Sequence, residues 1–281
     1  MMKKITVAML LCLISHQFLS ASDDSTSHLK ISIIIPCSYK HAEFLYPLLK
    51  MYTKQTVLPY EVIISLSEFH KAPLAAIKKI QYSRWPFRLR LLLSEYKQYA
   101  GTNRNIACEC ATGDVFVCQD SDDIPHPQRV EIIKYFFEHY DIDHLMHLYK
   151  FGEDLDHFPL LNRQHIDFSY NTDFENAWKE NPEIHNGCPA ITRAAFEKIQ
   201  WHNEAHREDT DFNRDAYRSF NRCMIINAPL YIYRSELSTW VAGARFHPSL
   251  HTYWDDLYDT FLLGYSKESK QGTQQTSDDN A

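Results

Sequence analysis

Unbroken hydrophobic runs alternate with helical patterns at the start of the chain. Residues 29–39 read LKISIIIPCSY and residues 60–67 read YEVIISLS, while apolar positions recur at helical spacing over residues 42–54 between them. Continuous apolarity, without polar alternation, is typical of strands covered on both faces, as in a parallel sheet. The stretch therefore predicts a βαβ unit, and hence an α/β fold.

The alternation continues along the chain, with one poorly patterned region. Residues 143–183 mix aromatic, acidic and histidine residues without a clear period, and only a strand near 145–151 is predicted there. The other expected strands cover residues 87–94, 115–118, a short segment ending at 192, and 224–234, the last broken by Pro229. Further helices are expected at 73–81, 101–111, 127–140, from 193, from 208, and at 250–263.

The strand at 115–118 runs directly into an acidic group, Asp120, Ser121, Asp122 and Asp123. Ligands of α/β sheets collect at the carboxyl ends of the strands. Isolated buried carboxylates cost several kcal/mol to desolvate, so this group needs water or a cation beside it. Carboxylate oxygens suit Mg²⁺ or Mn²⁺. A solvated turn closed by Pro125 is the commoner explanation of such a group, and the stretch alone does not decide between them.

Two predicted helices begin with charged residues. The helix at 101–111, GTNRNIACECA, carries Arg104 and Asn105 in its first turns, and a helix N-terminus with an arginine nearby is an anion site. A surface salt bridge explains Arg104 about as well. Glu208 and Asp209 open another helix, where the helix dipole alone accounts for carboxylates.

The amino-acid composition limits the classes of partner that the chain is expected to bind. A hydrophobic fraction of 44% in 281 residues indicates a folded chain, with either one large α/β domain or two small ones. The net charge of −7 supplies no basic field, so we expect no nucleic-acid partner. An anionic substrate would be bound by a metal ion or by a few placed arginines.

The N-terminus has the three-part pattern of a secretory signal. Lys3 and Lys4 precede the apolar run 5–14, and small residues follow up to Ala21. We expect residues 1–21 to direct export to a secretory lumen, the periplasm or the medium, with an uncleaved membrane anchor as the alternative. No other segment is long and apolar enough to span a bilayer, so no transmembrane bundle is expected.

The cysteines and histidines do not form a recognisable metal pattern. Cys37 and Cys118 lie in apolar strands, where a buried thiol is the default. Cys108 and Cys110 lack a second closely spaced pair, which argues against a zinc site. Export leaves open a disulfide among Cys108, Cys110, Cys188 and Cys223. We expect four histidines to lie on the surface, namely His144, His147, His157 and His165.

Four of these features, taken in order, resemble the GT-A nucleotide-sugar glycosyltransferases, most closely family 2. They are ISIIIPCSY, AGTNRNIA, QDSDD and REDTDF, and APLYIYR followed by Ser and Trp is similar to the segment that closes the family's domain. The resemblance implies a single Rossmann-like domain over residues 29–240, with a mostly parallel central sheet flanked by helices. A helical extension at 241–265 and a disordered polar tail at 266–281 would follow it.

The resemblance also implies roles for particular residues. Asp122, with Asp120 or Asp123, would hold Mn²⁺ or Mg²⁺ against the diphosphate of a nucleotide sugar. Asp209 would be the general base toward an acceptor hydroxyl, and Glu208 would position the acceptor or the base. The nucleotide sugar would be bound near Pro36, Arg104, Asn105 and Asp120.

The sequence departs from the family pattern after the second strand, where Leu66, Ser67 and Glu68 stand in place of acidic residues that meet the nucleobase. Ser67 or Glu68 could take that role from a shifted position, so a UDP-sugar is the first expectation and a GDP-sugar stays open. The acceptor could be a glycan, a protein or a lipid.

Three functional classes are compatible with these patterns. The leading one is metal-dependent, inverting glycosyl transfer, with retention as the alternative outcome on the same fold. A second is a secreted carbohydrate-binding protein that keeps the scaffold without turnover. A nucleotidyltransferase fits less well, because no glycine-rich phosphate loop follows the first strand.

Overall fold

The computed structural model describes residues 29–151, 158–170 and 173–234, together with Tyr258, Asp259, Phe261, Leu262 and Ser266. The predicted signal at 1–21, most of the extension at 241–265 and the tail beyond Ser266 lie outside the described residues, as does His157. Tyr258 and Phe261 pack against Met51 and Phe158, so this part of the C-terminal segment contacts the domain.

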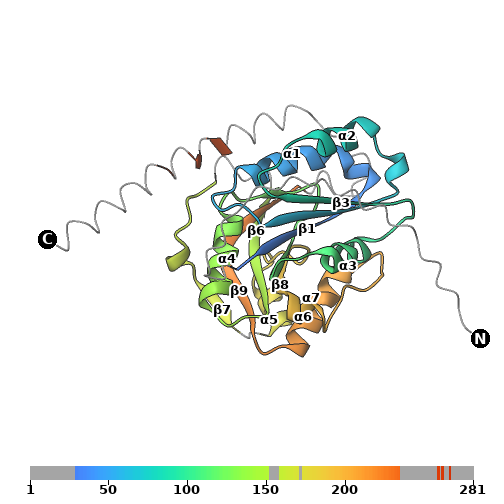
Figure 1. The fold of residues 1–281 in the computed structure, drawn as a ribbon. Helices are drawn as coiled ribbons and strands as arrows, with labels where there is room; N and C mark the ends of the chain where they lie inside the picture. The colour runs from blue at the N-terminus through green and yellow to red at the C-terminus, as the bar shows by residue number, and fades with distance from the viewer. Residues whose placement is uncertain are drawn as a thin grey trace, which may run out of the picture.

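One nine-stranded sheet organises the described chain (Figure 1). Its strand order is β3-β2-β1-β4-β8-β6-β9-β5, with β7 paired to β9. The strands are β1 (Ile31–Ser38), β2 (Glu61–Ser67), β3 (Arg88–Ser94), β4 (Val115–Cys118), β5 (Ile124–Pro125), β6 (His144–Phe151), β7 (Phe168–Tyr170), β8 (Ala190–Thr192) and β9 (Cys223–Tyr233).

The first four strands of the chain form a parallel unit. β1 lies between β2 and β4, and β2 pairs with β3, all in parallel register. Pro36 fits inside β1 because Ile34 is the last residue paired with β4, and Pro36 follows it on the same side. The predicted βαβ unit is confirmed, and the carboxyl ends of these strands share one edge.

The remaining strands form a mixed region. β8 is antiparallel to both β4 and β6, and β9 is parallel to β6. The predicted break at Pro229 is wrong, because β9 continues through it. The pairing slips there, with His147 opposite Ile226 but Leu148 opposite Pro229, and this irregularity accommodates the proline.

Helices cover both faces of the sheet (Figure 1). Ile33 and Ile35 face one apolar core and Ile34 faces the other, which explains why the strand reads as a continuous apolar run. The first core contains residues of α1 (Ala42–Thr53), α2 (Leu74–Tyr82) and α4 (Arg129–His139). The second contains residues of α3 (Ala100–Cys110), α6 (Arg193–Phe196) and α7 (Glu208–Ser219).

A seventh helix, α5 (Phe174–Glu180), lies in the region where the sequence showed no period, and it contacts α7. Within the described ranges, none of the helices has both the length and the apolarity required to cross a bilayer. The architecture is the predicted α/β domain with a central sheet between helices.

Two of the histidine predictions are wrong. His144 and His147 are buried in β6, whereas His165 is exposed as expected. His144 bonds Asn213 of α7 at 2.9 Å, and His147 bonds the carbonyl of Leu148 at 2.9 Å. Nε2 of His144 and Nδ1 of His147 thus have hydrogen-bond partners, which offset part of the cost of burying imidazoles in a sheet covered on both faces. The six described cysteines are free thiols.

Candidate active site

The acidic group lies where β4 ends, and hydrogen bonds from neighbouring buried side chains hold its turn. The side-chain amide of Gln119 donates to the carbonyls of Asp120 and Asp123, at 2.9 and 3.3 Å. Asp123 is buried, and its carboxylate accepts from the Tyr231 hydroxyl at 2.8 Å and from the Arg234 amide at 2.7 Å. Residues from β4 and from the end of β9 therefore meet at this edge.

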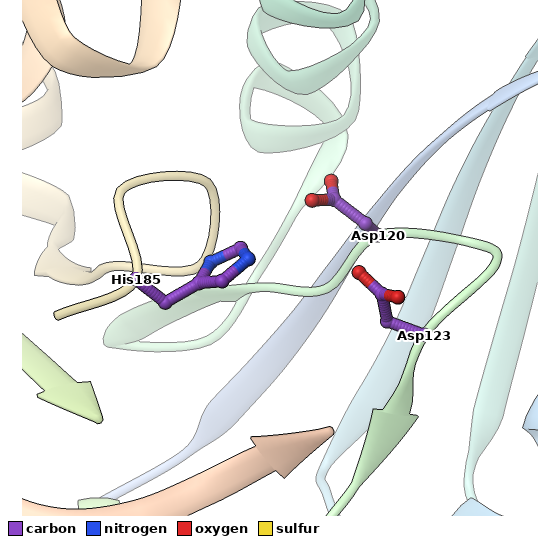
Figure 2. Close-up of side chains that lie close together, drawn as sticks. All are labelled: Asp120, Asp123 and His185. Atoms are coloured by element: carbon purple, nitrogen blue, oxygen red, sulfur yellow. The ribbon is translucent and has the colours of Figure 1, made fainter. Parts of the chain in front are cut away.

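Asp120 and Asp123 converge with a histidine that sequence reasoning missed. One ligand atom from each of Asp120, Asp123 and His185 lies within 4.8 Å of the others (Figure 2). Nδ1 of His185 is buried and has no hydrogen-bond partner among the described residues. Burial lowers the pKa of His185 to about 4, so this imidazole is neutral and free to ligate.

The electrostatics of this cluster favour a cation. Burial, together with the charges of Asp122 and Asp120, raises the pKa of Asp123 well above its usual range. A divalent cation would reverse that shift by compensating the crowded carboxylates. The orphaned nitrogen of His185 and the two carboxylates fit such an ion.

Asp122 lies apart from this cluster. Its carboxylate is 3.7 Å from Nδ1 of His41, and its backbone carbonyl accepts from the Arg234 side chain. The turn thus directs neighbouring aspartates to different partners, which residue types alone could not reveal.

Arg104 joins the acidic group to the start of α7. Its guanidinium is 2% exposed and donates from Nη2 to Oδ1 of Asp120 at 2.8 Å and from Nη1 to Oδ1 of Asp209. Glu208 lies 3.6 Å from the same Nη1. Arg104 is therefore a buried bridge between carboxylates far apart in the sequence, and the alternative of a surface salt bridge is wrong.

Asp209 has the properties of a base at neutral pH. Burial raises its pKa to about 7, the charges of Glu208 and Asp120 act in the same direction, and Arg104 opposes them. A general base is most effective when its pKa lies near the operating pH. The helix begins abruptly here, because Arg207 adopts a left-handed φ of 68° just before it.

The residues expected near the nucleotide gather at the same sheet edge. Ser67 pairs with Ser38 at the ends of β2 and β1, and its hydroxyl donates to the carbonyl of Cys37 at 3.3 Å. Glu68 follows in a left-handed turn and is paired with Lys71. Pro36 precedes this edge by two residues.

Asn105 is placed differently from the other predicted residues. Its amide donates to the carbonyl of Trp201 at 2.8 Å, and its side-chain oxygen accepts from the Trp201 amide at 3.0 Å. The neighbouring Asn103 accepts from Ser65 at 2.9 Å and donates to Ser67 at 3.3 Å. Asn105 thus fastens the segment before α7, while Asn103, which sequence reasoning left without a role, fastens α3 to β2.

Comparisons with known proteins agree with this layout. The sequence model of a family described as "Glycosyl transferase family 2" matches residues 32–200. No curated protein sequence matches the chain significantly.

Solved structures share the fold at low identity. S. aureus TarS 1-349 in complex with UDP-GlcNAc is 18% identical, with a TM-score of 0.60, over 84% of this chain and 65% of TarS 1-349. The mannosyltransferase PcManGT from Pyrobaculum calidifontis, in complex with GDP-Man and Mn²⁺, is 15% identical, with a TM-score of 0.54, over 78% of this chain and 59% of its own. The chain thus spans less than two thirds of either solved structure.

Proposed function

Because this chain belongs to glycosyl transferase family 2, we propose that it transfers a sugar from a nucleoside-diphosphate sugar to an acceptor hydroxyl. One observation carries the proposal: Arg104 holds Asp120, at the end of β4, beside Asp209, at the start of α7. The first carboxylate suits a cation that binds a diphosphate, and the second suits base catalysis on a hydroxyl.

A cation site at Asp120, Asp123 and His185 supports this function. Carboxylates favour Mg²⁺ and Mn²⁺, and the imidazole shifts the preference toward Mn²⁺. This assignment replaces Asp122 with His185, because Asp122 lies against His41. When bound, the cation would neutralise charge that develops on the departing diphosphate.

The reaction we propose is a direct displacement with inversion. The acceptor oxygen forms a bond to the anomeric carbon, and the bond from that carbon to the diphosphate oxygen breaks with its electron pair leaving on the diphosphate. The proton of the acceptor hydroxyl passes to Asp209, whose pKa of about 7 suits it to this transfer. Glu208 shares Arg104 with Asp209 and holds the base in position.

The donor side lies along the ends of β1 and β2. Pro36, Ser67 and Glu68 collect there and are our candidates for contact with the nucleoside. We propose a UDP-sugar first and a GDP-sugar second, since the similar structures were solved with UDP-GlcNAc and with GDP-Man.

The remaining assignments concern the ends of the chain. We propose that residues 1–21 direct export or anchor the protein to a membrane, that 29–240 form the transferase domain, and that 241–265 extend it before a polar tail at 266–281. The enzyme would then act in a lumen, the periplasm or the medium, on a glycan, protein or lipid acceptor.

Calorimetric titration tests the proposal directly. UDP and GDP are titrated into the full-length protein with Mn²⁺, and again with EDTA, using the wild type and the Asp120→Asn variant. We expect one nucleotide to bind the wild type in the presence of Mn²⁺ but not in EDTA. The Asp120→Asn variant should lose that binding, because the cation loses a ligand.

Asp114→Asn is the matched control. Asp114 precedes β4 at its opposite end and accepts from the Lys30 amide at 2.8 Å, so the change should leave nucleotide binding intact. Failure of both nucleotides to bind the wild type, together with binding of free glycans without metal, would favour the carbohydrate-binding alternative and overturn the proposal.

A further inference from the structure

Arg129, the first residue of α4, is a buried cation that the proposed mechanism does not use. Its side chain is fully buried, and no carboxylate of the described residues pairs with it. Its hydrogen-bond partners are all neutral acceptors, namely the Tyr52 hydroxyl, the side-chain oxygen of Gln119, Nε2 of His147 and the carbonyls of Cys118 and Cys188. Burying a charge without a counter-ion is costly, so the position of this guanidinium needs a physical reason.

The first reason lies in the pairing of β4 with β8. Val117 lies opposite Ala190 in this antiparallel pair, so Cys118 lies opposite Pro189. Hydrogen-bonded residues that oppose each other in such a pair exchange two backbone bonds. The Cys118 amide donates to the Pro189 carbonyl at 3.0 Å, but a proline has no N–H to donate in return. Nη2 of Arg129 donates to the Cys118 carbonyl at 2.8 Å and replaces the missing bond.

The second reason lies where the two segments diverge. β4 leads on to Asp120, while His185 lies in the loop that enters β8 through Cys188. Nη2 of Arg129 also donates to the Cys188 carbonyl at 3.3 Å. Carbonyls only accept hydrogen bonds, so those of Cys118 and Cys188 need a donor between them. The guanidinium therefore joins the strand that leads to Asp120 to the loop that carries His185.

The same side chain also supports the turn of the acidic group. Nη1 of Arg129 donates to the side-chain oxygen of Gln119 at 3.2 Å, and the Gln119 amide donates to the carbonyls of Asp120 and Asp123. The guanidinium carbon lies 5.6 Å from the centre of the Tyr231 ring, whose hydroxyl donates to Asp123. Arg129 is thus one neighbour removed from the aspartates of the cation site.

His147 and Tyr52 fix the orientation of the guanidinium. Nδ1 of His147 donates to the Leu148 carbonyl at 2.9 Å, which leaves Nε2 as an acceptor. That atom lies 3.2 Å from Nη2 of Arg129 and 3.4 Å from Nε. The Tyr52 hydroxyl accepts from Nη1 at 3.3 Å. Each nitrogen of the guanidinium therefore has a partner, and the side chain is held in one position.

We propose that Arg129 is a positioning residue for the cation site, where it sets the separation between the carboxylates of Asp120 and Asp123 and the imidazole of His185. The inference rests on the proposed function, since it concerns the cation that this function uses, and it adds a residue that ligates nothing itself. Outer partners of metal ligands control metal affinity by orienting those ligands. Loss of the guanidinium should therefore appear as a loss of Mn²⁺ affinity.

Arg193, at the opposite end of β4, provides the matched control. Its Nη2 donates to the carbonyl of Ala111 at 3.0 Å and to that of Gly113 at 2.5 Å. Its guanidinium carbon lies 4.9 Å from the centre of the Phe116 ring. Arg193 thus joins backbone carbonyls beside β4, as Arg129 does, but it contacts no residue that we assign to the site.

The test measures Mn²⁺ affinity directly. Mn²⁺ is titrated into the full-length wild type, Arg129→Lys and Arg193→Lys, with and without UDP or GDP. Free Mn²⁺ is read by electron paramagnetic resonance, and thermal unfolding is recorded for each protein. Lysine keeps the charge but lacks the planar fork that contacts both carbonyls and Gln119. We expect Arg129→Lys to weaken Mn²⁺ binding about tenfold, whereas Arg193→Lys should lower the melting temperature and leave the affinity unchanged.

A rescue variant separates positioning from general stability. Pro189→Ala restores a backbone N–H that can donate to the Cys118 carbonyl, so its addition to Arg129→Lys should recover part of the lost Mn²⁺ affinity. If Arg129→Lys does not fold, Tyr52→Phe takes its place. This change removes one partner of the guanidinium and should weaken Mn²⁺ binding severalfold.

The possible outcomes separate the two proposals. Unchanged Mn²⁺ affinity in folded Arg129→Lys, or an equal loss in Arg193→Lys, would overturn the role of Arg129. A double variant that recovers stability but no affinity would do the same, as would unchanged affinity in Tyr52→Phe where Arg129→Lys does not fold. Absence of Mn²⁺ binding by the wild type, with or without nucleotide, would overturn the cation site on which the proposed function depends.

Discussion

Two groups of carboxylates meet in this site, and they are held in different ways. The strand-end group, Asp120 and Asp123, follows a buried strand and is fastened by Gln119, Tyr231 and the backbone of Arg234. The helix-start group, Glu208 and Asp209, has one shared buried partner, Arg104. The fold therefore fixes the backbone of the first group and the carboxylate of Asp123, whereas the carboxylates of the second group depend on the guanidinium of Arg104, which Asp120 shares.

The largest expected effect separates the roles of the two groups. Asp209→Asn removes the base but keeps the size of the side chain, so transfer should fall by about 10²- to 10⁴-fold. Nucleotide binding with Mn²⁺ should stay within a few fold of the wild type, as measured by calorimetry. Asp211→Asn, two residues further along α7, is the control, and full turnover in Asp209→Asn would contradict the assignment.

Removal of the bridge should disturb the helix-start group most. Arg104→Met keeps much of the buried volume but leaves carboxylates without a counter-charge, so unfolding free energy should fall by about 3 kcal/mol. Chemical denaturation measures this loss. A double mutant with Asp209→Asn should lose less than the sum of the single changes, because the two residues act as one pair. Strict additivity would refute the bridge.

The pH dependence of the unfolding free energy tests the contribution of His144, which bonds α7 to the sheet through Asn213. Burial lowers the pKa of His144 to about 4, against about 6.5 in an unfolded chain. The unfolded state therefore binds more protons between these values, and stability present above pH 6.5 is lost as the pH falls toward 4. By pH 5 this histidine should account for a loss of about 2 kcal/mol.

His144→Gln keeps a donor that can reach Asn213 and removes the titration. The pH dependence of its denaturation midpoint should be shallower than that of the wild type between pH 6.5 and 5. An unchanged slope would mean that His144 does not contribute to the pH dependence of stability.

The smallest expected effect concerns the strand-end group. Tyr231→Phe removes one hydroxyl that donates to Asp123 at 2.8 Å and accepts from the Asp120 amide at 3.2 Å. Because outer partners orient metal ligands, the affinity for Mn²⁺ should fall about tenfold, with little loss of fold. Tyr60→Phe, at the other end of β2, serves as the control for a lost hydroxyl.

Sequence reasoning succeeded where local pattern and fold agree. The parallel strands and their helices were predictable because strands covered on both faces require unbroken apolar runs. The position of Asp120 at a sheet edge followed from its place after β4. The mixed region was less predictable, since β6, β8 and β9 pair across long sequence distances and Pro229 sits inside a strand by a slip in register.

Prediction of the site would have required the directions of its side chains, which the sequence does not give. Nothing in a run of aspartates indicates that Asp122 turns to His41 while Asp123 turns toward His185. His185 stands alone in the sequence and joins the carboxylates only because β8 is inserted beside β4. A histidine immediately before Asn-Gly, shortly ahead of a short strand, is the one local signal that could have drawn attention to it.

The surplus of negative charge around Arg104 has a consequence for the order of events during turnover. Five acidic residues, Asp120, Asp122, Asp123, Glu208 and Asp209, lie in this part of the molecule. Arg104 pairs with the carboxylates of Asp120, Glu208 and Asp209, whereas Arg234 donates from its backbone amide to Asp123 and from its side chain to the carbonyl of Asp122. A bare diphosphate would meet net repulsion on approach, while a diphosphate already complexed with a divalent cation would not. On the proposed function, we therefore expect the cation to bind before the nucleotide or together with it, because it compensates these carboxylates.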